Sequence, residues 1–234
     1  MQKKISKRYQ CAAKLVDPSR RYPLGEAVAL LKRLPPTKFD QTVALSFRLG
    51  VNPKRTDHMV RGTCLLPHGS GKSMRVLVFA TGRAAIDAQE AGAEYVGYED
   101  LLKRVGAGFF GFDVAIATPA AMVEVRKLGR ILGPRGLMPN PKAGTVAEDT
   151  AAAVREVKSG RIEFKMDKSA NISVPIGKFS FLGDCLIGNG RAVIDTLLKA
   201  RPATAKGLFL RKITLSATMS PGLGVESPHS PRTS

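Results

Sequence analysis

Two hydrophobic patterns divide this 234-residue chain, and they limit its possible folds more than any other feature. In residues 42–49, apolar and polar positions alternate, which predicts a strand with one face in a core and one face in solvent. Residues 74–81 and 112–118 are almost continuously apolar. Such runs are typical of strands that are covered on both faces. The sequence therefore predicts two different kinds of sheet.

The middle of the chain alternates strands with helices. Helical patterns in residues 83–93, 99–105 and 119–132 separate the apolar strands and a short strand at 94–97. A repeated strand–helix order predicts a small, doubly wound parallel sheet with helices on both faces. A loop rich in glycine and proline, residues 133–145, precedes the last helix of this part.

The two ends of the chain share the other pattern. They predict helices and half-buried strands at residues 24–34, 42–49, 59–66, 161–167, 172–178, 184–200 and 207–219. We expect these elements to form one α+β domain with a mostly antiparallel sheet, so that the fold class is α/β with two domains. The discontinuous domain comprises residues 1–67 and 161–222, and residues 68–160 are inserted in it. Residues 223–234 are expected to form a disordered tail.

The charge of the chain indicates a polyanionic partner. Lysine and arginine total 37 against 19 aspartates and glutamates, which gives a formal net charge of +18. The flanks carry +10 and +6, whereas residues 68–160 carry only +2, so the basic surface belongs to the discontinuous domain. Such a balance is typical of proteins that bind nucleic acid. No apolar run approaches the roughly 20 residues of a membrane span, so we expect no membrane partner.

The cysteines and histidines give no sign of a metal site. Cys11, Cys64 and Cys185 form no CxxC pair and do not cluster with the three histidines. A structural zinc site needs about four ligands, so we expect no metal and interpret Cys64 as a small core residue. The first ten residues are polar and basic and do not resemble a secretory signal. We therefore expect a reducing, cytoplasmic, bacterial-type compartment.

Two glycine-rich segments imitate nucleotide-binding motifs. Residues 106–111 match GxGxxG, but a helical pattern precedes them and a strand follows, the reverse of the order that a dinucleotide site requires. Residues 69–73 resemble the end of a P-loop, but Leu66 replaces its first glycine and no helix follows. We interpret the first segment as a turn after a helix and the second as part of an interdomain hinge. The hinge glycines are Gly69, Gly71 and Gly160.

No catalytic constellation accompanies these segments, so we expect neither an enzyme nor a cofactor. Two rival functions remain open. One is a nucleotide-dependent enzyme that uses the inserted domain. The other is a non-specific polyanion binder, which would bind any duplex with a purely salt-dependent affinity.

Residues 128–146, LGRILGPRGLMPNPKAGTV, are the most specific segment of the chain. Together with residues 38–72, 159–178 and 206–219, they resemble the L-one family of large-subunit ribosomal proteins in its bacterial form. The resemblance extends from about Lys7 to about Gly222 and so covers nearly the whole chain.

This resemblance implies both a fold and a function. The domain made from both chain ends would bind RNA, and the insertion would be a Rossmann-like, three-layer α/β domain that binds no dinucleotide. The protein would be a structural constituent of the large ribosomal subunit that binds the mobile stalk of 23S rRNA. It would assist the release of deacylated tRNA from the E site and repress translation of its own operon mRNA through an rRNA-like site. The expected location is the cytoplasmic, bacterial ribosome, with no small-molecule substrate.

The resemblance also implies a set of RNA-binding residues. They are Lys38, Phe39, Thr42, Asp167, Lys168, Ser169, Thr218 and Met219. Ser220 completes the set, in a place where the family usually has glycine, which permits close backbone approach to RNA. Charge adds Arg55 and Arg61 as residues that neutralise phosphates. Two alternatives stay open: Phe39 can pack in the core, and Asp167 can bond its own turn.

The loop segment 126–142 holds five cations and no acidic residue. The cations are Arg126, Lys127, Arg130, Arg135 and Lys142. Its glycines and prolines can simply fix the path between two helices. Our hypothesis is instead that the cations face a passing tRNA or the other domain.

Overall fold

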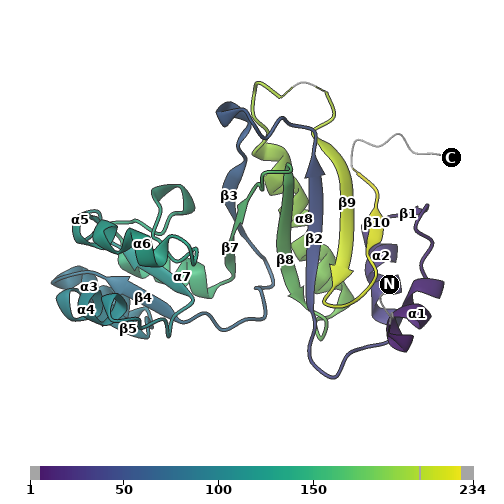
Figure 1. Cartoon of the computed structure of the whole chain (residues 1–234). Helices are drawn as coiled ribbons and strands as arrows, with labels where there is room; N and C mark the ends of the chain where they lie inside the picture. Colours follow the sequence, from purple (N-terminus) through teal and green to yellow (C-terminus); the bar gives the residue numbers. More distant parts are fainter. Residues whose placement is uncertain (1–5, 206, 228–234) are drawn as a thin grey trace. The chain divides into compact units, whose positions relative to one another are not determined.

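The structure is a computed structural model that describes residues 6–205 and 207–227, without the side chains of Thr56 and Lys142 (Figure 1). These residues form two compact units. Unit 1 contains the described residues up to Gly71 and those from Ile162 onward. Unit 2 runs from Lys72 to Arg161.

Unit 1 is built on a five-stranded sheet with the strand order β1-β10-β9-β2-β8. The strands are β1 (Arg21–Tyr22), β2 (Thr42–Leu49), β8 (Asn171–Lys178), β9 (Leu210–Ala217) and β10 (Leu223–Val225). Strand β2 pairs antiparallel with β8 on one side and β9 on the other, and only β1 and β10 pair in parallel. Strands β3 (Arg61–Leu65) and β7 (Arg161–Lys165) form a separate pair. The predicted, mostly antiparallel sheet is thus confirmed.

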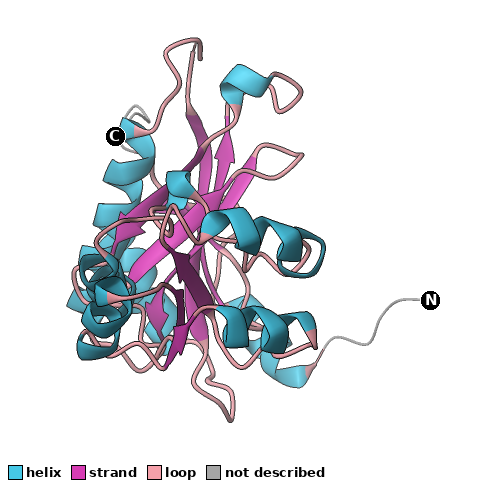
Figure 2. Cartoon of the chain, turned by 90° about the vertical axis from the view of Figure 1, so that its left-hand side faces the viewer, coloured by secondary structure: helices cyan, strands magenta, loops and turns pink. Residues whose placement is uncertain are grey.

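The alternation in β2 decides which face of the sheet is covered. Val43, Leu45 and Phe47 are buried in the core of unit 1, whereas the residues between them are not. Helices α2 (Leu24–Arg33) and α8 (Gly183–Lys199) pack on the buried side, and α8 runs along one side of the sheet (Figures 1 and 2). Among the described elements of unit 1, neither α2 nor α8 nor α1 (Lys7–Lys14) covers the opposite face (Figure 1).

Unit 2 contains a parallel three-stranded sheet with the order β5-β4-β6. The strands are β4 (Val76–Phe79), β5 (Tyr95–Gly97) and β6 (Val114–Ala117). Helices α3 (Arg83–Glu90) and α7 (Thr150–Lys158) pack against one face, as the cluster of Val76, Val78 and Ile116 shows. Helices α4 (Glu99–Gly106), α5 (Met122–Val125) and α6 (Gly129–Leu132) pack against the other. The helices on both faces confirm the arrangement predicted from the continuous apolar runs.

Two sequence predictions need correction, and one helix was not predicted. The helix expected at 119–132 begins only at Met122 and is broken into α5, a 3₁₀ turn η2 (Arg126–Leu128) and α6, because Gly129 weakens a helix interior. The tail expected from residue 223 begins instead with β10, whose Leu223 is fully buried. Residues 228–234 lie outside the described residues. Helix α1, capped by Ser6, was not predicted.

The first part of unit 1 extends to Gly71, and a buried amide bonds the residues after Pro67 to this unit. Asn189 on α8 is fully buried. Its Oδ1 accepts from the His68 N–H at 3.0 Å, and its Nδ2 donates to the carbonyls of Gly69 at 3.0 Å and Ile176 at 2.8 Å. Gly69, Gly71 and Gly160 all have positive φ, at 69°, 70° and 105°. Glycine adopts such angles without a Cβ clash.

Neither residues 106–111 nor residues 69–73 lead into the N-terminus of a helix, which both nucleotide-binding motifs require. Gly106 ends α4, Gly108 has a φ of 99°, and the chain then enters β6, so this segment is the turn after a helix. Strand β4 follows the P-loop-like segment, and the Lys72 ammonium lies 2.7 Å from the Asp113 carboxylate.

Replacing Asn189 with Ala should lower the free energy of unfolding of unit 1 by about 2–3 kcal/mol, because buried N–H and C=O groups lose their partner. Urea denaturation measures this loss. Gln89→Ala, which removes an exposed amide, is the matched control and should change stability little. Equal stability of the two variants would show that the buried Asn189 amide does not stabilise the segment of His68 and Gly69.

Asp113 should make the stability of unit 2 depend on acid pH. Hydrogen bonds from Lys72, and further ones from Arg75, lower the pKa of this carboxyl from 3.8 to about 2. Because the folded pKa is depressed, the stabilisation is complete above the unfolded pKa and is lost as pH falls from about 4 toward 2. Asp113→Asn should flatten this part of the stability–pH curve, measured by thermal unfolding. An unchanged curve would contradict the assignment.

Candidate nucleic-acid interface

The uncovered side of the unit 1 sheet, which we call the open face, is lined mainly by small polar side chains. On β2 it presents Thr42, Ala44, Ser46 and Arg48. Their cross-strand partners in register lie on the same face: Asn171, Ser173, Pro175 and Lys178 on β8, and Lys212, Thr214 and Ser216 on β9. The Ser46 and Ser173 hydroxyls lie 3.1 Å apart. From Thr42 to Arg48 the face is about 20 Å long, at about 3.4 Å per residue.

The charges on the open face are all positive among the described residues that line it. Arg48 stands directly opposite Lys212. Like charges in this position destabilise a sheet. Neither residue forms a salt bridge within the described part of the chain. A pair of facing cations without a carboxylate partner is an arrangement that an external anion would relieve.

At one end of the open face, which we call the Thr218 end, β2 begins and β9 ends. The Thr218 Oγ1 accepts from the backbone N–H of Thr42 at 3.2 Å, and the Thr218 N–H donates to the Thr42 carbonyl at 3.1 Å. Lys178 donates to the Thr42 hydroxyl at 3.0 Å. Gln41, only 2% exposed, donates to the Thr218 carbonyl at 2.5 Å. These bonds fix the backbone around two of the predicted RNA-binding residues.

A tight turn at the Thr218 end exposes Met219. This residue has a φ of 62° and is 66% exposed, and the Arg8 guanidinium donates to its carbonyl at 2.6 Å. Ser220 turns inward: its hydroxyl accepts from the Ala217 N–H at 2.9 Å and donates to the Pro221 carbonyl. Phe39 is 50% exposed. The alternative that placed Phe39 in the core is therefore wrong.

The other end of the open face, which we call the hairpin end, carries the turn before β8. Asn171 is the register partner of Arg48, so Asp167, Lys168 and Ser169 lie at the end opposite Thr218. The backbone N–H of Asn171 donates to the Asp167 carboxylate at 2.7 Å and that of Ser169 at 2.8 Å. These bonds, the first above all, hold the pKa of Asp167 below its usual value. The carboxylate thus bonds the backbone of its own turn. This favours a structural role for Asp167 in the turn over a direct contact with RNA.

Arg55 and Arg61 do not lie on the open face. Arg61, on β3, pairs with Glu163 at 2.5 Å, so its charge already has a partner. Arg55 lies in the loop after β2 and lines a pocket there.

The cations of the segment 126–142 differ in their partners. Lys127 pairs with Glu124 at 2.8 Å, and the Arg135 guanidinium lies 3.5 Å above the Phe110 ring. Arg126 and Arg130 are exposed. The side chain of Lys142 lies outside the description.

Neither a metal-binding group nor a membrane-spanning helix is found among the residues that the structure describes. Among them, no group of three or more histidine, cysteine or acidic side chains is placed to hold a metal ion. Cys64 is 3% exposed and packs in the core of unit 1, as predicted. Within the same residues, no helix combines the length and apolar character that a bilayer span requires.

Sequence reasoning missed several residues of the open face and its two ends. They are Arg8, Gln41, Arg48, Ser173, Lys178, Lys212, Thr214 and Ser216. The alternation in 42–49 already assigned Arg48 to the solvent face, and the same reading of β9 would have assigned Lys212, Thr214 and Ser216 to it. No local pattern indicated Arg8, because its contact with Met219 joins the two ends of the chain.

Comparison with known families agrees with this interface. The model of the ribosomal protein L1p/L10e family matches residues 30–221, which include the three strands β2, β8 and β9 of the open face and the segment 126–142. Proteins of this family are structural and not enzymes, so the alternative of a nucleotide-dependent enzyme is wrong. The chain belongs to the ribosomal protein L1p/L10e family and is a structural, RNA-binding constituent of the large ribosomal subunit.

Proposed function

We propose that this protein binds the mobile stalk of bacterial 23S rRNA in the cytoplasm, and that the open face is the surface that contacts it. The observation that carries the proposal is the rows of hydroxyls on β2, β8 and β9, flanked by Arg48 and Lys212, which form no salt bridge within the described part of the chain. The family supports binding to large-subunit rRNA, and the open face supplies a surface of suitable chemistry.

The open face suits the minor groove of A-form RNA. This groove is wide and shallow and displays 2′-hydroxyls, so proteins recognise it by shape and by short hydrogen-bonding side chains. Ser46, Ser173 and Thr214 form a continuous row across three strands. Arg48 and Lys212 at the hairpin end would neutralise phosphates.

The two ends of the open face would contact the RNA differently. At the Thr218 end, Phe39 and Met219 offer exposed apolar surface to a sugar or base, and Lys38 offers a charge. At the hairpin end, Lys168 and Ser169 are exposed, whereas Asp167 positions them through the turn. Both groups of predicted residues can therefore serve one RNA that lies along the face.

We propose that the same surface also binds the protein's own operon mRNA and represses its translation. An mRNA segment that folds like the rRNA stalk would occupy the open face in the same way. The two RNAs would then compete, so that free protein represses its own synthesis only when rRNA sites are filled.

Release of E-site tRNA is assigned to unit 2. The segment 126–142 presents Arg126 and Arg130 to solvent, and Arg135 is stacked on Phe110. Exposed guanidinium groups suit the phosphates of a tRNA. Gly69, Gly71 and Gly160, with their positive φ angles, are the proposed hinge that lets the units reorient during release.

The double variant Ser46→Ala/Thr214→Val should weaken binding to a stalk rRNA fragment about tenfold or more. Each lost hydroxyl contact contributes about 0.5–1.5 kcal/mol. The salt dependence should stay unchanged, because no charge is removed. Filter binding across a salt series measures both quantities, and Thr81→Val in unit 2 is the control for a lost exposed hydroxyl.

A length-matched RNA duplex distinguishes this function from non-specific binding. The wild-type protein should prefer the stalk fragment even at high salt, and the double variant should lose that preference. Equal affinity for both RNAs, erased by salt in every variant, would instead favour the non-specific polyanion binder.

The double variant Arg130→Ala/Arg135→Ala should slow tRNA release while leaving stalk affinity unchanged. If each exposed cation contributes about 0.7 kcal/mol, release slows about tenfold. Fluorescent tRNA on ribosomes reconstituted with each variant measures the rate. The control is Arg83→Ala/Arg155→Ala, two exposed cations on α3 and α7. A collapse of stalk binding in the first variant would reject the assignment to tRNA.

A further inference from the structure

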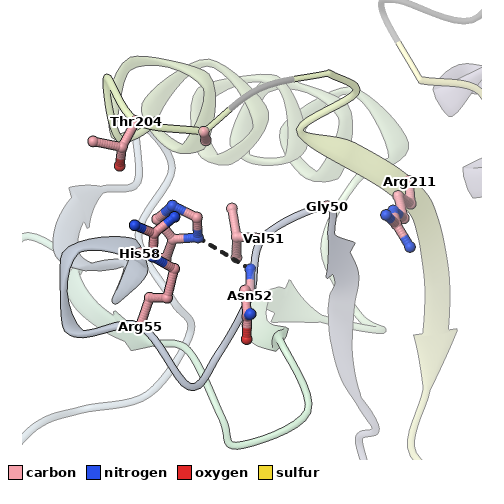
Figure 3. Close-up of a pocket in the computed structure, with 8 residues that line it drawn as sticks. Gly50, Val51, Asn52, Arg55, His58, Thr204 and Arg211 are labelled. Carbon is pink, nitrogen blue, oxygen red and sulfur yellow. Dashed lines mark hydrogen bonds between the residues drawn. The ribbon is translucent and has the colours of Figure 1, made fainter.

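We propose that a pocket beside the hairpin end of the open face binds a phosphate group of the bound RNA. The pocket has a volume of about 460 Å³ and lies between the loop after β2 and the segment before β9 (Figure 3). This inference deepens the function proposed above and rests on it for the source of the phosphate, but not for the presence of a phosphate site.

A buried histidine supplies the first argument. His58 is 7% exposed, and its Nδ1 accepts from the backbone N–H of Asn52 at 3.1 Å (Figure 3). Because Nδ1 accepts, the ring hydrogen is on Nε2. This Nε2 is buried and has no hydrogen-bond partner among the described residues. An unpaired buried donor costs about 1–3 kcal/mol. Because His58 lines the pocket, an acceptor that reached the ring from the pocket would remove this cost.

Two guanidinium groups supply the charge. Arg55 lies beside His58, and Arg211, on β9, lies across the segment of Gly50, Val51 and Asn52 from them (Figure 3). Neither arginine forms a salt bridge within the described part of the chain, and no described residue that lines the pocket is acidic. The pocket thus combines two strong cations with a neutral N–H donor, which selects an anion that only accepts hydrogen bonds.

The backbone holds Arg211 close to the pocket wall. A Cβ at Gly50 would lie 2.0 Å from the Leu208 carbonyl oxygen and 3.2 Å from the Arg211 Nε. Only glycine therefore permits this close approach of the loop after β2 to the segment before β9. Gly50 lines the pocket as well, so the packing that forms the pocket also places one of its cations.

The position of the pocket identifies the RNA backbone as the source of the phosphate. Arg48 and Lys212, the facing cations of the open face, are two residues from Gly50 and one residue from Arg211 in sequence. An RNA strand on the hairpin end would therefore pass the mouth of the pocket. At about 460 Å³ the pocket has room for a phosphate with its sugar, within the usual range of about 300–1,000 Å³ for ligand sites.

Inorganic phosphate is the first probe, added to the full-length protein and followed by the NMR signals of the His58 ring nitrogens. We expect phosphate to shift the Nε2 signal in the wild-type protein and not in Arg55→Gln/Arg211→Gln. The matched control is Arg33→Gln/Arg191→Gln, which removes the same charge from exposed positions on α2 and α8 and should keep the shift. Far-UV circular dichroism checks that all variants are folded. Absence of a shift in the wild-type protein, or equal shifts in all variants, would overturn the phosphate site.

The stalk rRNA fragment is the second probe. Loss of one phosphate contact should reduce the slope of log K against log salt by about 0.7–0.9 in the pocket variant and not in the control. An unchanged slope, together with a phosphate-induced shift, would mean that the pocket takes free phosphate and would overturn the RNA as its source. If instead the stalk fragment shows no preference over a duplex, the proposed function fails, and the phosphate titration still decides the pocket.

Discussion

The antiparallel pairing of β2 between β8 and β9 is the interaction on which the rest of unit 1 depends. Strand β2 comes from the first part of the chain, and its two partners come from the last part. The register places Ser46 beside Ser173 and Thr214. A slip of one residue would turn Leu45 and Phe47 to solvent and bury the hydroxyls. Burial of the apolar side chains on one face therefore fixes the register that places the hydroxyls on the other face. The same burial energy that folds unit 1 therefore arranges the candidate RNA surface.

Buried amides complete this arrangement where the strands end. Gln41 holds the Thr218 carbonyl, and Asn189 holds the segment that leaves unit 1 at His68 and Gly69. Both amides are almost fully buried, and each satisfies backbone groups that would otherwise be costly to bury. Lys32 plays a similar part, since it donates to the carbonyls of Phe179 and Phe181 after β8. A rigid Thr218 end reduces the entropy that RNA binding must overcome.

Much of this fold could be predicted because its main signals are local. Alternation in 42–49 and the continuous runs around β4 and β6 report burial directly, and the structure confirms them. The pairing of β1 with β10 could not be predicted, because two residues carry no period and their partner lies at the other end of the chain. The same reason explains why Arg8 was missed. The phosphate pocket likewise depends on the approach of Gly50 to Leu208, which spacing in sequence does not encode.

Ser220 stands where the family usually has glycine, and the turn around it accommodates the serine side chain. Among the non-glycine residues of this turn that the structure describes, positive φ falls on Met219 and not on Ser220, so a Cβ at position 220 meets no backbone strain. The Ser220 hydroxyl closes the turn by accepting from the Ala217 N–H and donating to the Pro221 carbonyl. A glycine would leave that N–H without this acceptor. The serine therefore strengthens the turn that exposes Met219, and its hydroxyl bonds the protein's own backbone. In the RNA interface that we propose, the contacts at this end therefore come from Thr218 and Met219, whose carbonyl groups accept from Gln41 and Arg8.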